Sequence, residues 1–131
     1  MLIQTIKTER VSPKKQSLLA FLDRSLVSVP EKSILVITSK VVALSEGRFI
    51  AKTNGITDET IAAEADYYLP KNKSSYGVPL TIRDNTFVAR AGIDASNTDG
   101  VYSLLPSDSY AAARMVREHL IKRFELIQAL E

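Results

Sequence analysis

Apolar and polar residues along this chain follow two different spacings, which predict strands and helices in alternation. Residues 2–7 alternate apolar and polar side chains, which predicts a half-exposed strand. The uninterrupted apolar run at 34–37 predicts a central strand that is buried on both faces. Two short β-prone runs, at 80–82 and 86–89, flank a polar Arg-Asp-Asn, and together they predict a β-hairpin.

Helices are predicted where capping residues precede apolar positions that are three or four apart. Ser12 and Pro13 predict a helix start, and the helix should end near residues 29–30. A short helix is expected from residue 38 to 47, and another from Thr57 to about residue 69. A long C-terminal helix should open at residues 106–109. The expected buried positions are Leu18, Leu19, Leu22 and Leu26 in the first helix, Ile61, Ala65 and either Tyr68 or Leu69 in the third, and Ala113, Val116, Leu120, Phe124 and Ile127 in the last.

The element order β-α-β-α-α-β-β-α predicts an α+β fold, a mixed α/β layered domain. The chain has 131 residues, of which 45% are hydrophobic and 24% charged, so residues 1–131 fit one globular domain. The net charge of +2 argues against nucleic acid and acidic membrane surfaces as partners. No signal peptide or membrane span is expected.

The residue types that are rare here restrict the chemistry. The chain has no cysteine, which excludes disulfides, thiolate catalysis and cysteine-bound zinc, and which fits a reducing cytoplasm. With one histidine, His119, a His-based triad or a multi-histidine metal site is not expected. His119 itself is expected to be a partly buried or solvated residue of the last helix. Any chemistry must use carboxylates, hydroxyls, lysine, arginine, backbone amides or a bound metal.

The richest polar segment is residues 91–97, Ala-Gly-Ile-Asp-Ala-Ser-Asn, directly after the predicted hairpin. Asp94 is a hard oxygen ligand that suits Mg²⁺ or Mn²⁺, and Ser96 and Asn97 can bind phosphate, ribose or base. The alternative is an Asx-type turn in which the loop caps its own backbone. Residues 46–48, Glu-Gly-Arg, similarly suit either a binding role or a helix C-cap with a surface ion pair.

Three segments together resemble the amino-terminal half of the coenzyme F-420 γ-glutamyl ligases. They are residues 37–48 (ITSKVVALSEGR), 91–97 (AGIDASN) and 104–108 (LLPSD). The resemblance implies an enzyme that uses GTP and a divalent metal, Mg²⁺ or Mn²⁺, to join glutamate to a deazaflavin coenzyme through an amide bond. It also implies a cytoplasmic protein that binds a nucleotide and a small-molecule substrate and that can form a homodimer.

The resemblance assigns a metal-ligand role to Asp94 and nucleotide contacts to Ser39 and Asn97. Family members usually carry a lysine at the position of Leu44, and the nearest lysine here is Lys40, four residues earlier. Their other metal ligands lie in a segment that would follow Glu131. Two hypotheses therefore stand. Either the chain is an incomplete ligase whose composite site is completed by another segment or chain, or it is a non-catalytic binding or assembly module derived from the family.

Overall fold

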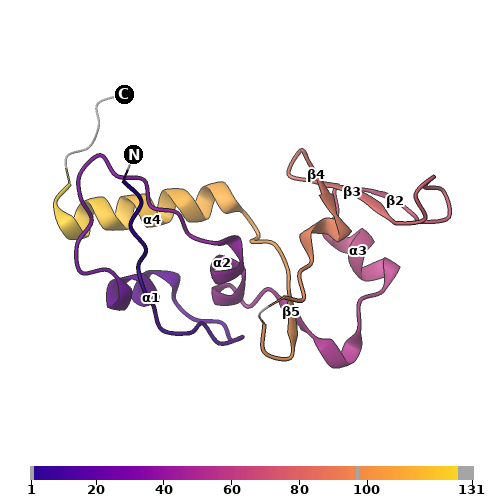
Figure 1. Cartoon of the computed structure of the whole chain (residues 1–131), viewed down its shortest axis with the longest axis horizontal. Helices are drawn as coiled ribbons and strands as arrows, with labels where there is room; N and C mark the ends of the chain where they lie inside the picture. Colours follow the sequence, from indigo (N-terminus) through magenta and orange to yellow (C-terminus); the bar gives the residue numbers. More distant parts are fainter. Residues whose placement is uncertain (1, 97, 127–131) are drawn as a thin grey trace.

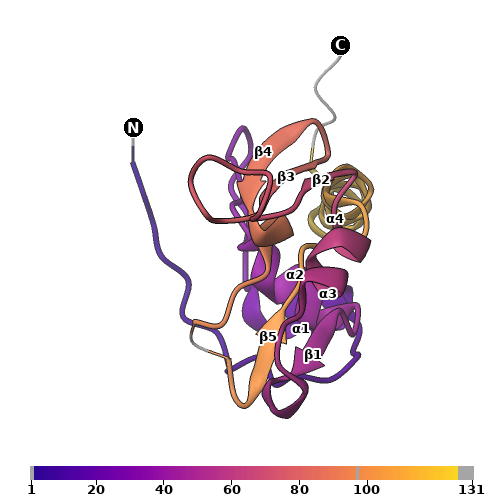
Figure 2. The ribbon, with the colours of Figure 1, turned by 90° about the vertical axis from the view of Figure 1, so that its right-hand side faces the viewer.

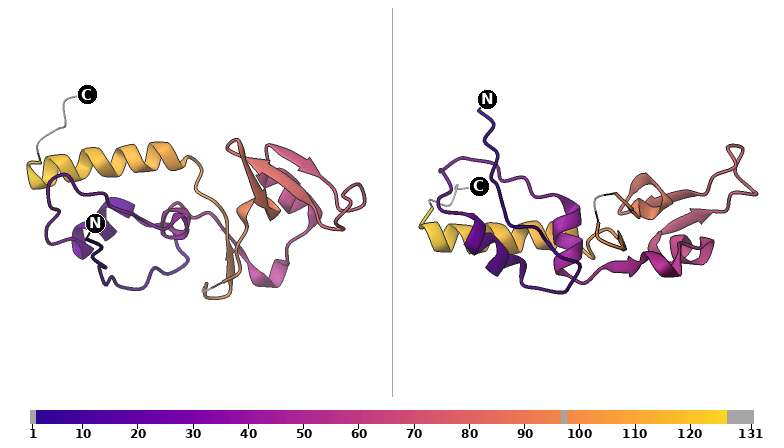
Figure 3. Two further views of the ribbon diagram at one scale, coloured as in Figure 1. Left: turned by 45° about the horizontal axis from the view of Figure 1, so that its top comes forward. Right: turned by 60° about the horizontal axis from the view of Figure 1, so that its bottom comes forward.

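The computed structural model describes residues 2–96 and 98–126, which form a helical lobe and a β-rich lobe side by side (Figure 1). Helices α1 (Leu18–Ser25), α2 (Ser39–Ser45) and α4 (Ser109–Phe124) form the helical lobe. Figure 3 shows the two lobes at opposite ends of the molecule. The α+β class is confirmed, together with the hairpin and the long C-terminal helix.

The helical lobe is held together by apolar side chains from its three helices and from the C-cap of α1. One face of α1 and two positions of α4 are buried against α2. The residues of this core are Leu18, Phe21, Leu22, Leu26, Val42, Val116 and Leu120. On α4 the predicted Val116 and Leu120 are buried, whereas Ala113 is exposed and Ala112 packs against the core instead. The predicted Ile127 lies outside the described residues.

The β-rich lobe combines α3 (Asp58–Glu64) with a sheet in the order β2-β3-β4. Its strands are β2 (Tyr67–Leu69), β3 (Leu80–Arg83) and β4 (Thr86–Ala89), all antiparallel. The hairpin turns at Asp84 and Asn85, which both have positive φ. A two-residue turn needs this conformation to match the twist of the two strands. A second core under this sheet contains Ile61, Ala91, Ile93 and Leu104.

A two-stranded antiparallel sheet joins the lobes. It pairs β1 (Phe49–Ala51) with β5 (Val101–Ser103). β1 follows α2 and β5 precedes α4, so this sheet connects both helices to the loop that follows the hairpin. The sequence pattern did not predict β1 or β5, and it placed β2 inside the third helix.

Helix starts follow their capping residues, with one correction. Thr57 and Asp108 accept hydrogen bonds from the backbone N–H groups of Thr60 and Ala111, so α3 and α4 begin near the predicted positions. The first helix does not begin at Ser12–Pro13. Ser17 is its N-cap and accepts from Ala20 N, and the helix ends at Ser25 rather than near residue 29. No helix in the described ranges is long and apolar enough to cross a membrane.

The prediction of strands at residues 2–7 and 34–37 is wrong, because neither segment belongs to a sheet. Residues 2–7 are exposed and lie in no sheet, and residues 34–37 are also outside both sheets. Ile34 and Val36 are 91% and 86% exposed, so this run is not buried on both faces. The physical reason is that a strand needs a hydrogen-bonding neighbour, and no described segment pairs with either run.

Candidate functional site

The loop after the hairpin is held by a strained turn and by β5. Helix η2 (Arg90–Gly92) carries positive φ at Arg90, Ala91 and Gly92. Asp94 then pairs with Ser103 through two backbone hydrogen bonds, Asp94 N to Ser103 O at 2.9 Å and Ser103 N to Asp94 O at 2.8 Å. The backbone of Asp94 is therefore fixed opposite the end of β5, and its side chain lies at the start of the loop that leads to that strand.

Protein donors contact both oxygens of the Asp94 carboxylate. Its Oδ1 accepts from the backbone N–H of Ser96 at 2.8 Å, which closes an Asx turn. Its Oδ2 accepts from the hydroxyl of Ser96 at 2.9 Å and lies 2.8 Å from Nζ of Lys40. The self-capping turn foreseen as an alternative is thus present, and a lysine from α2 is added to it.

Two lysines hold the backbone of this loop. Lys40 Nζ donates to the carbonyl oxygen of Ser96 at 2.5 Å and to its hydroxyl at 3.1 Å. Lys52 Nζ donates to the carbonyl oxygens of Ala95 at 3.0 Å and Thr98 at 3.4 Å. The loop that resembles a nucleotide and metal loop is therefore lined by two ammonium groups, which favours an anionic ligand.

The pKa of Asp94 falls from its usual 3.8 to about 2. The hydrogen bond from Lys40 is the largest cause, followed by the two donors of Ser96, while burial opposes them. Because the folded pKa is depressed, the carboxylate contributes stability above about pH 4, and this contribution is lost as the pH falls towards about 2.

An Asp94→Asn variant should therefore be less stable than the wild type above about pH 4, and the difference should close between pH 4 and 2. The gap should be at most about 1 kcal/mol, because the Asp94 side chain is 45% exposed and solvent screens the pair. Denaturant unfolding at a series of pH values measures it. In a Lys40→Met background, Asp94→Asn should lower the free energy of unfolding by less. An unchanged difference would contradict the assignment of the low Asp94 pKa to Lys40.

The other predicted site residues are placed apart from Asp94 or lie outside the description. Ser39 begins α2 beside Lys40, and its side chain lines a groove on the helical lobe. Asn97 lies outside the described residues. Asp99 pairs with Arg10, with Oδ1 2.5 Å from Nη2, and Asp108 caps α4. Neither carboxylate joins Asp94.

The described residues do not by themselves form a metal centre. Across 2–96 and 98–126, no group of three histidine, cysteine, aspartate or glutamate side chains is placed to hold a metal. Asp94 alone offers one carboxylate, and a hard cation such as Mg²⁺ takes about six oxygens. One oxygen of that carboxylate, Oδ2, is also paired with Lys40.

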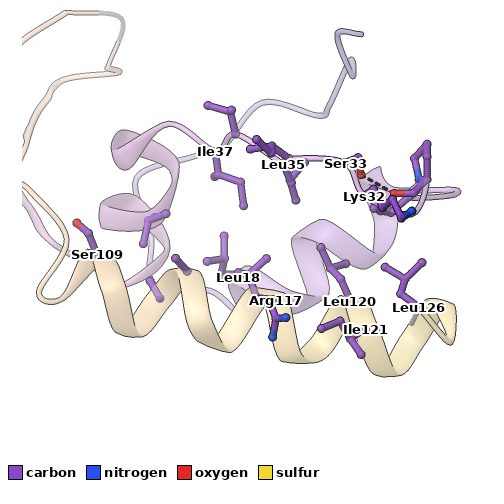
Figure 4. Close-up of a pocket in the computed structure, with 18 of the residues that line it drawn as sticks. Leu18, Lys32, Ser33, Leu35, Ile37, Ser109, Arg117, Leu120, Ile121 and Leu126 are labelled. Carbon is purple, nitrogen blue, oxygen red and sulfur yellow. Dashed lines mark hydrogen bonds between the residues drawn. The ribbon is translucent and has the colours of Figure 1, made fainter. Parts of the chain in front are cut away.

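An apolar groove of ≈ 670 Å³ lies on the helical lobe, away from Asp94. One wall is the segment that carries Ser33, Leu35 and Ile37, and the other is α4 with Leu120 and Ile121 (Figure 4). Ser39 and Ser109 also line it. The groove and the polar loop are therefore different features of the surface.

Polar contacts join the three segments that carry the family resemblance. Glu46, the C-cap residue of α2, accepts hydrogen bonds from Ser107 N at 2.8 Å and from the Ser107 hydroxyl at 2.9 Å. Arg48 Nε donates to the carbonyl oxygen of Leu105 at 2.6 Å. Segments that are about 60 residues apart in sequence thus meet in space. Leu44, which stands where family members usually have lysine, is buried at 4% exposure.

Glu64 joins the two lobes through two arginines, and sequence reasoning missed this cluster. Its carboxylate pairs with Arg48 and with Arg83, whose Nη1 lies 2.7 Å away. Arg83 also donates to the carbonyl oxygens of Glu64 and Pro106. Glu64 and Arg83 carry no local signal, because each partner comes from a different element. Arg48 was singled out only together with Glu46 and Gly47, for a binding role or a surface ion pair. The contact of Lys52 with the loop was not predicted for the same reason. The sequence left open which way Lys40 points, and the structure shows that it faces the loop.

The fold and the site define an α+β protein in which a polar loop, lined by lysines, is held between a small sheet and a short helix. A family model described as F420-0:gamma-glutamyl ligase matches residues 5–128, nearly the whole chain. The chain therefore belongs to the F420-0:gamma-glutamyl ligase family, and the resemblance carried by its three motif segments is confirmed.

Proposed function

We propose that this chain forms part of a nucleotide- and metal-dependent ligase that adds glutamate to a deazaflavin coenzyme. The observation that carries the proposal is the family match over residues 5–128. Two sets of contacts support it, because together they join the three motif segments: those of Glu46 and Arg48 with residues 105–107, and those of Lys40 with Asp94 and Ser96. The small-molecule substrates would be the coenzyme, with its carboxylate, and glutamate, with its amine.

In this proposal Asp94 is one ligand of a composite metal site, and Ser39 and Asn97 contact the nucleotide. Further oxygen ligands must come from outside the described residues or from another chain, since the described part supplies a single carboxylate at this point. Lys40 and Lys52 add positive charge beside the loop, which suits a polyphosphate. The chain would work in the cytoplasm and without nucleic acid.

Calorimetric titration of GTP in the presence of Mg²⁺ or Mn²⁺ tests this proposal. Micromolar, metal-dependent binding is expected, and Asp94→Ala should weaken it by at least about tenfold because the metal loses a ligand. Asp99→Ala is the matched control, since Asp99 lies in the same segment but pairs with Arg10. Absence of binding by the wild type, or equal binding by Asp94→Ala, would contradict the proposal for this chain.

The second candidate function is a non-catalytic binding or assembly module that keeps the family fold. Two observations favour it: the oxygens of Asp94 are already engaged by Lys40 and Ser96, and Leu44 is buried where relatives usually carry lysine. The same titration separates the two functions. A module of this kind would show no metal-dependent heat with GTP in either the wild type or the Asp94→Ala variant.

A further inference from the structure

Lys52 follows the end of β1 directly, and its side chain crosses β5 to reach the polar loop. It is the first residue of the short helix η1 (Lys52–Asn54). Ser103 of β5 faces Phe49 of β1 on one edge and exchanges two backbone hydrogen bonds with Asp94 on the other edge. The segment that follows Asp94 is therefore separated from β1 by β5, as Figure 2 shows. A contact between the two needs a side chain as long as lysine.

The backbone and the side chain of Lys52 are both held against β5. The backbone N–H donates to the carbonyl oxygen of Gly100 at 2.8 Å, which continues the pairing of β1 with β5 by one residue. Nζ lies 5.9 Å from the centre of the Tyr102 ring, whose face attracts a cation. The side chain of Lys52 is therefore directed along one face of β5 towards the loop.

The ammonium group of Lys52 joins two carbonyl oxygens of the loop. Nζ donates to Ala95 O at 3.0 Å and to Thr98 O at 3.4 Å. The hydroxyl of Thr98 donates to the same Ala95 oxygen at 3.4 Å, and Thr98 is buried. Hydrogen bonds from a charged donor are stronger than those between neutral groups. Lys52 therefore holds the two ends of residues 95–98 together.

The two lysines of the site act on the loop in different ways. Lys40 pairs with the carboxylate of Asp94 as well as with the carbonyl oxygen of Ser96, so it changes the charge beside the candidate metal ligand. Within the described residues, the hydrogen bonds of the Lys52 ammonium go to backbone carbonyl oxygens alone. The effect of Lys52 on a ligand is therefore indirect, through the position of the loop backbone.

We propose that Lys52 is a positioning residue for ligand binding, which fixes residues 95–98 so that Asp94 and its neighbours present one arrangement to the ligand. The proposal rests on the function proposed above, because it takes the loop as the place where a nucleotide and its metal bind. A loop that is ordered before binding loses less conformational entropy when the ligand arrives, so affinity rises without a new contact.

Amide hydrogen exchange, followed by NMR, tests the positioning without a ligand. In Lys52→Met the N–H of Ser96, which closes the Asx turn on Asp94, should exchange about three- to tenfold faster than in the wild type. The N–H of Asp94 should keep its protection, because its bond to Ser103 does not involve Lys52. Lys71→Met is the matched control: Lys71 is exposed, and its side chain makes no hydrogen bond or ion pair with the described residues.

Calorimetric titration of GTP with Mg²⁺ tests the consequence for binding. Lys52→Met should weaken binding by about three- to tenfold, Lys52→Arg by less, and Lys71→Met should leave it unchanged. In an Asp94→Ala background Lys52→Met should have little further effect, because the loop that Lys52 positions has already lost its main ligand contact. A general loss of stability, or a direct contact between Lys52 and the nucleotide, would give the same loss of affinity in both backgrounds.

Two results would overturn the role of Lys52. One is Ser96 exchange that is equally fast in Lys52→Met and Lys71→Met. The other is an equal loss of GTP affinity on Lys52→Met with and without Asp94. Absence of binding by the wild type would overturn the proposed function and this role with it, whereas wild-type binding that Lys52→Met leaves unchanged would overturn this role alone.

Discussion

Replacing Glu64 with alanine should lower the free energy of unfolding by about 3–5 kcal/mol, one of the two largest effects expected in this protein. Glu64 is the carboxylate that Arg48 and Arg83 share, and the three side chains are 18%, 24% and 12% exposed. Without it, two guanidinium groups stay largely buried and close together, and the remaining counter-charge is the exposed carboxylate of Asp84. Nε of Arg83 makes no hydrogen bond within the described residues, and its other ion-pair contact, with Oδ2 of Asp84, is long at 4.0 Å.

Chemical denaturation measures this loss, and two further variants show its origin. Glu64→Gln keeps the size and an acceptor oxygen, so its loss should fall between the wild type and Glu64→Ala. Glu59→Ala removes an exposed carboxylate from the first turn of the same helix and should lose much less stability than Glu64→Ala. A Glu64→Ala variant no less stable than Glu59→Ala would show that the cluster does not join the lobes.

Local sequence signals predicted the elements whose causes are local. The hairpin follows from a polar Asp-Asn turn between two β-prone runs, and both turn residues adopt the positive φ that such a turn needs. The starts of α3 and α4 follow from Thr57 and Asp108, whose side chains satisfy free N–H groups. These features depend on residues at most four apart, so one sequence is enough to find them.

Elements that depend on distant partners were not predictable in the same way. Strands β1 and β5 have three residues each, too few to show a period, and exist because they pair with each other. Tyr68 fitted the helical spacing from Ile61, but the chain leaves the helix at Ala65 and pairs with β3 instead. Residues 34–37 show the opposite error, because their strand-like pattern is real but has no neighbour to pair with.

The contacts of the candidate site also separate into local ones, which the sequence could suggest, and distant ones, which it could not. The Asx turn of Asp94 was an open alternative from the sequence, because both of its partners lie within two residues. The contact with Lys40, 54 positions earlier in the chain, required the fold. The family match identifies the ancestry of this loop, whereas the lysines around it identify which of its atoms are already engaged.

Replacing Gly92 with alanine should lower the free energy of unfolding by about 2–5 kcal/mol, for two separate reasons. Gly92 has φ +77°, where a Cβ costs about 1–2 kcal/mol. That Cβ would also lie 2.6 Å from both Cγ and Cδ1 of Leu105, a clash worth about 1–3 kcal/mol. Arg48 holds the carbonyl oxygen of Leu105, so the clash has to be relieved by the Leu105 side chain rather than by a shift of its backbone. Denaturant midpoints measure the change.

Gly100 separates the two causes. Its φ is +66°, yet an added Cβ would have nothing within 4 Å, so Gly100→Ala should lose only the backbone cost of about 1–2 kcal/mol. Adding Leu105→Ala to Gly92→Ala should cost less than Leu105→Ala does in the wild type, because the clash disappears with the side chain. If Gly92→Ala and Gly100→Ala were equally stable, Leu105 would not press on the turn. The position of Asp94, two residues further on, would then be set by its pairing with Ser103 alone.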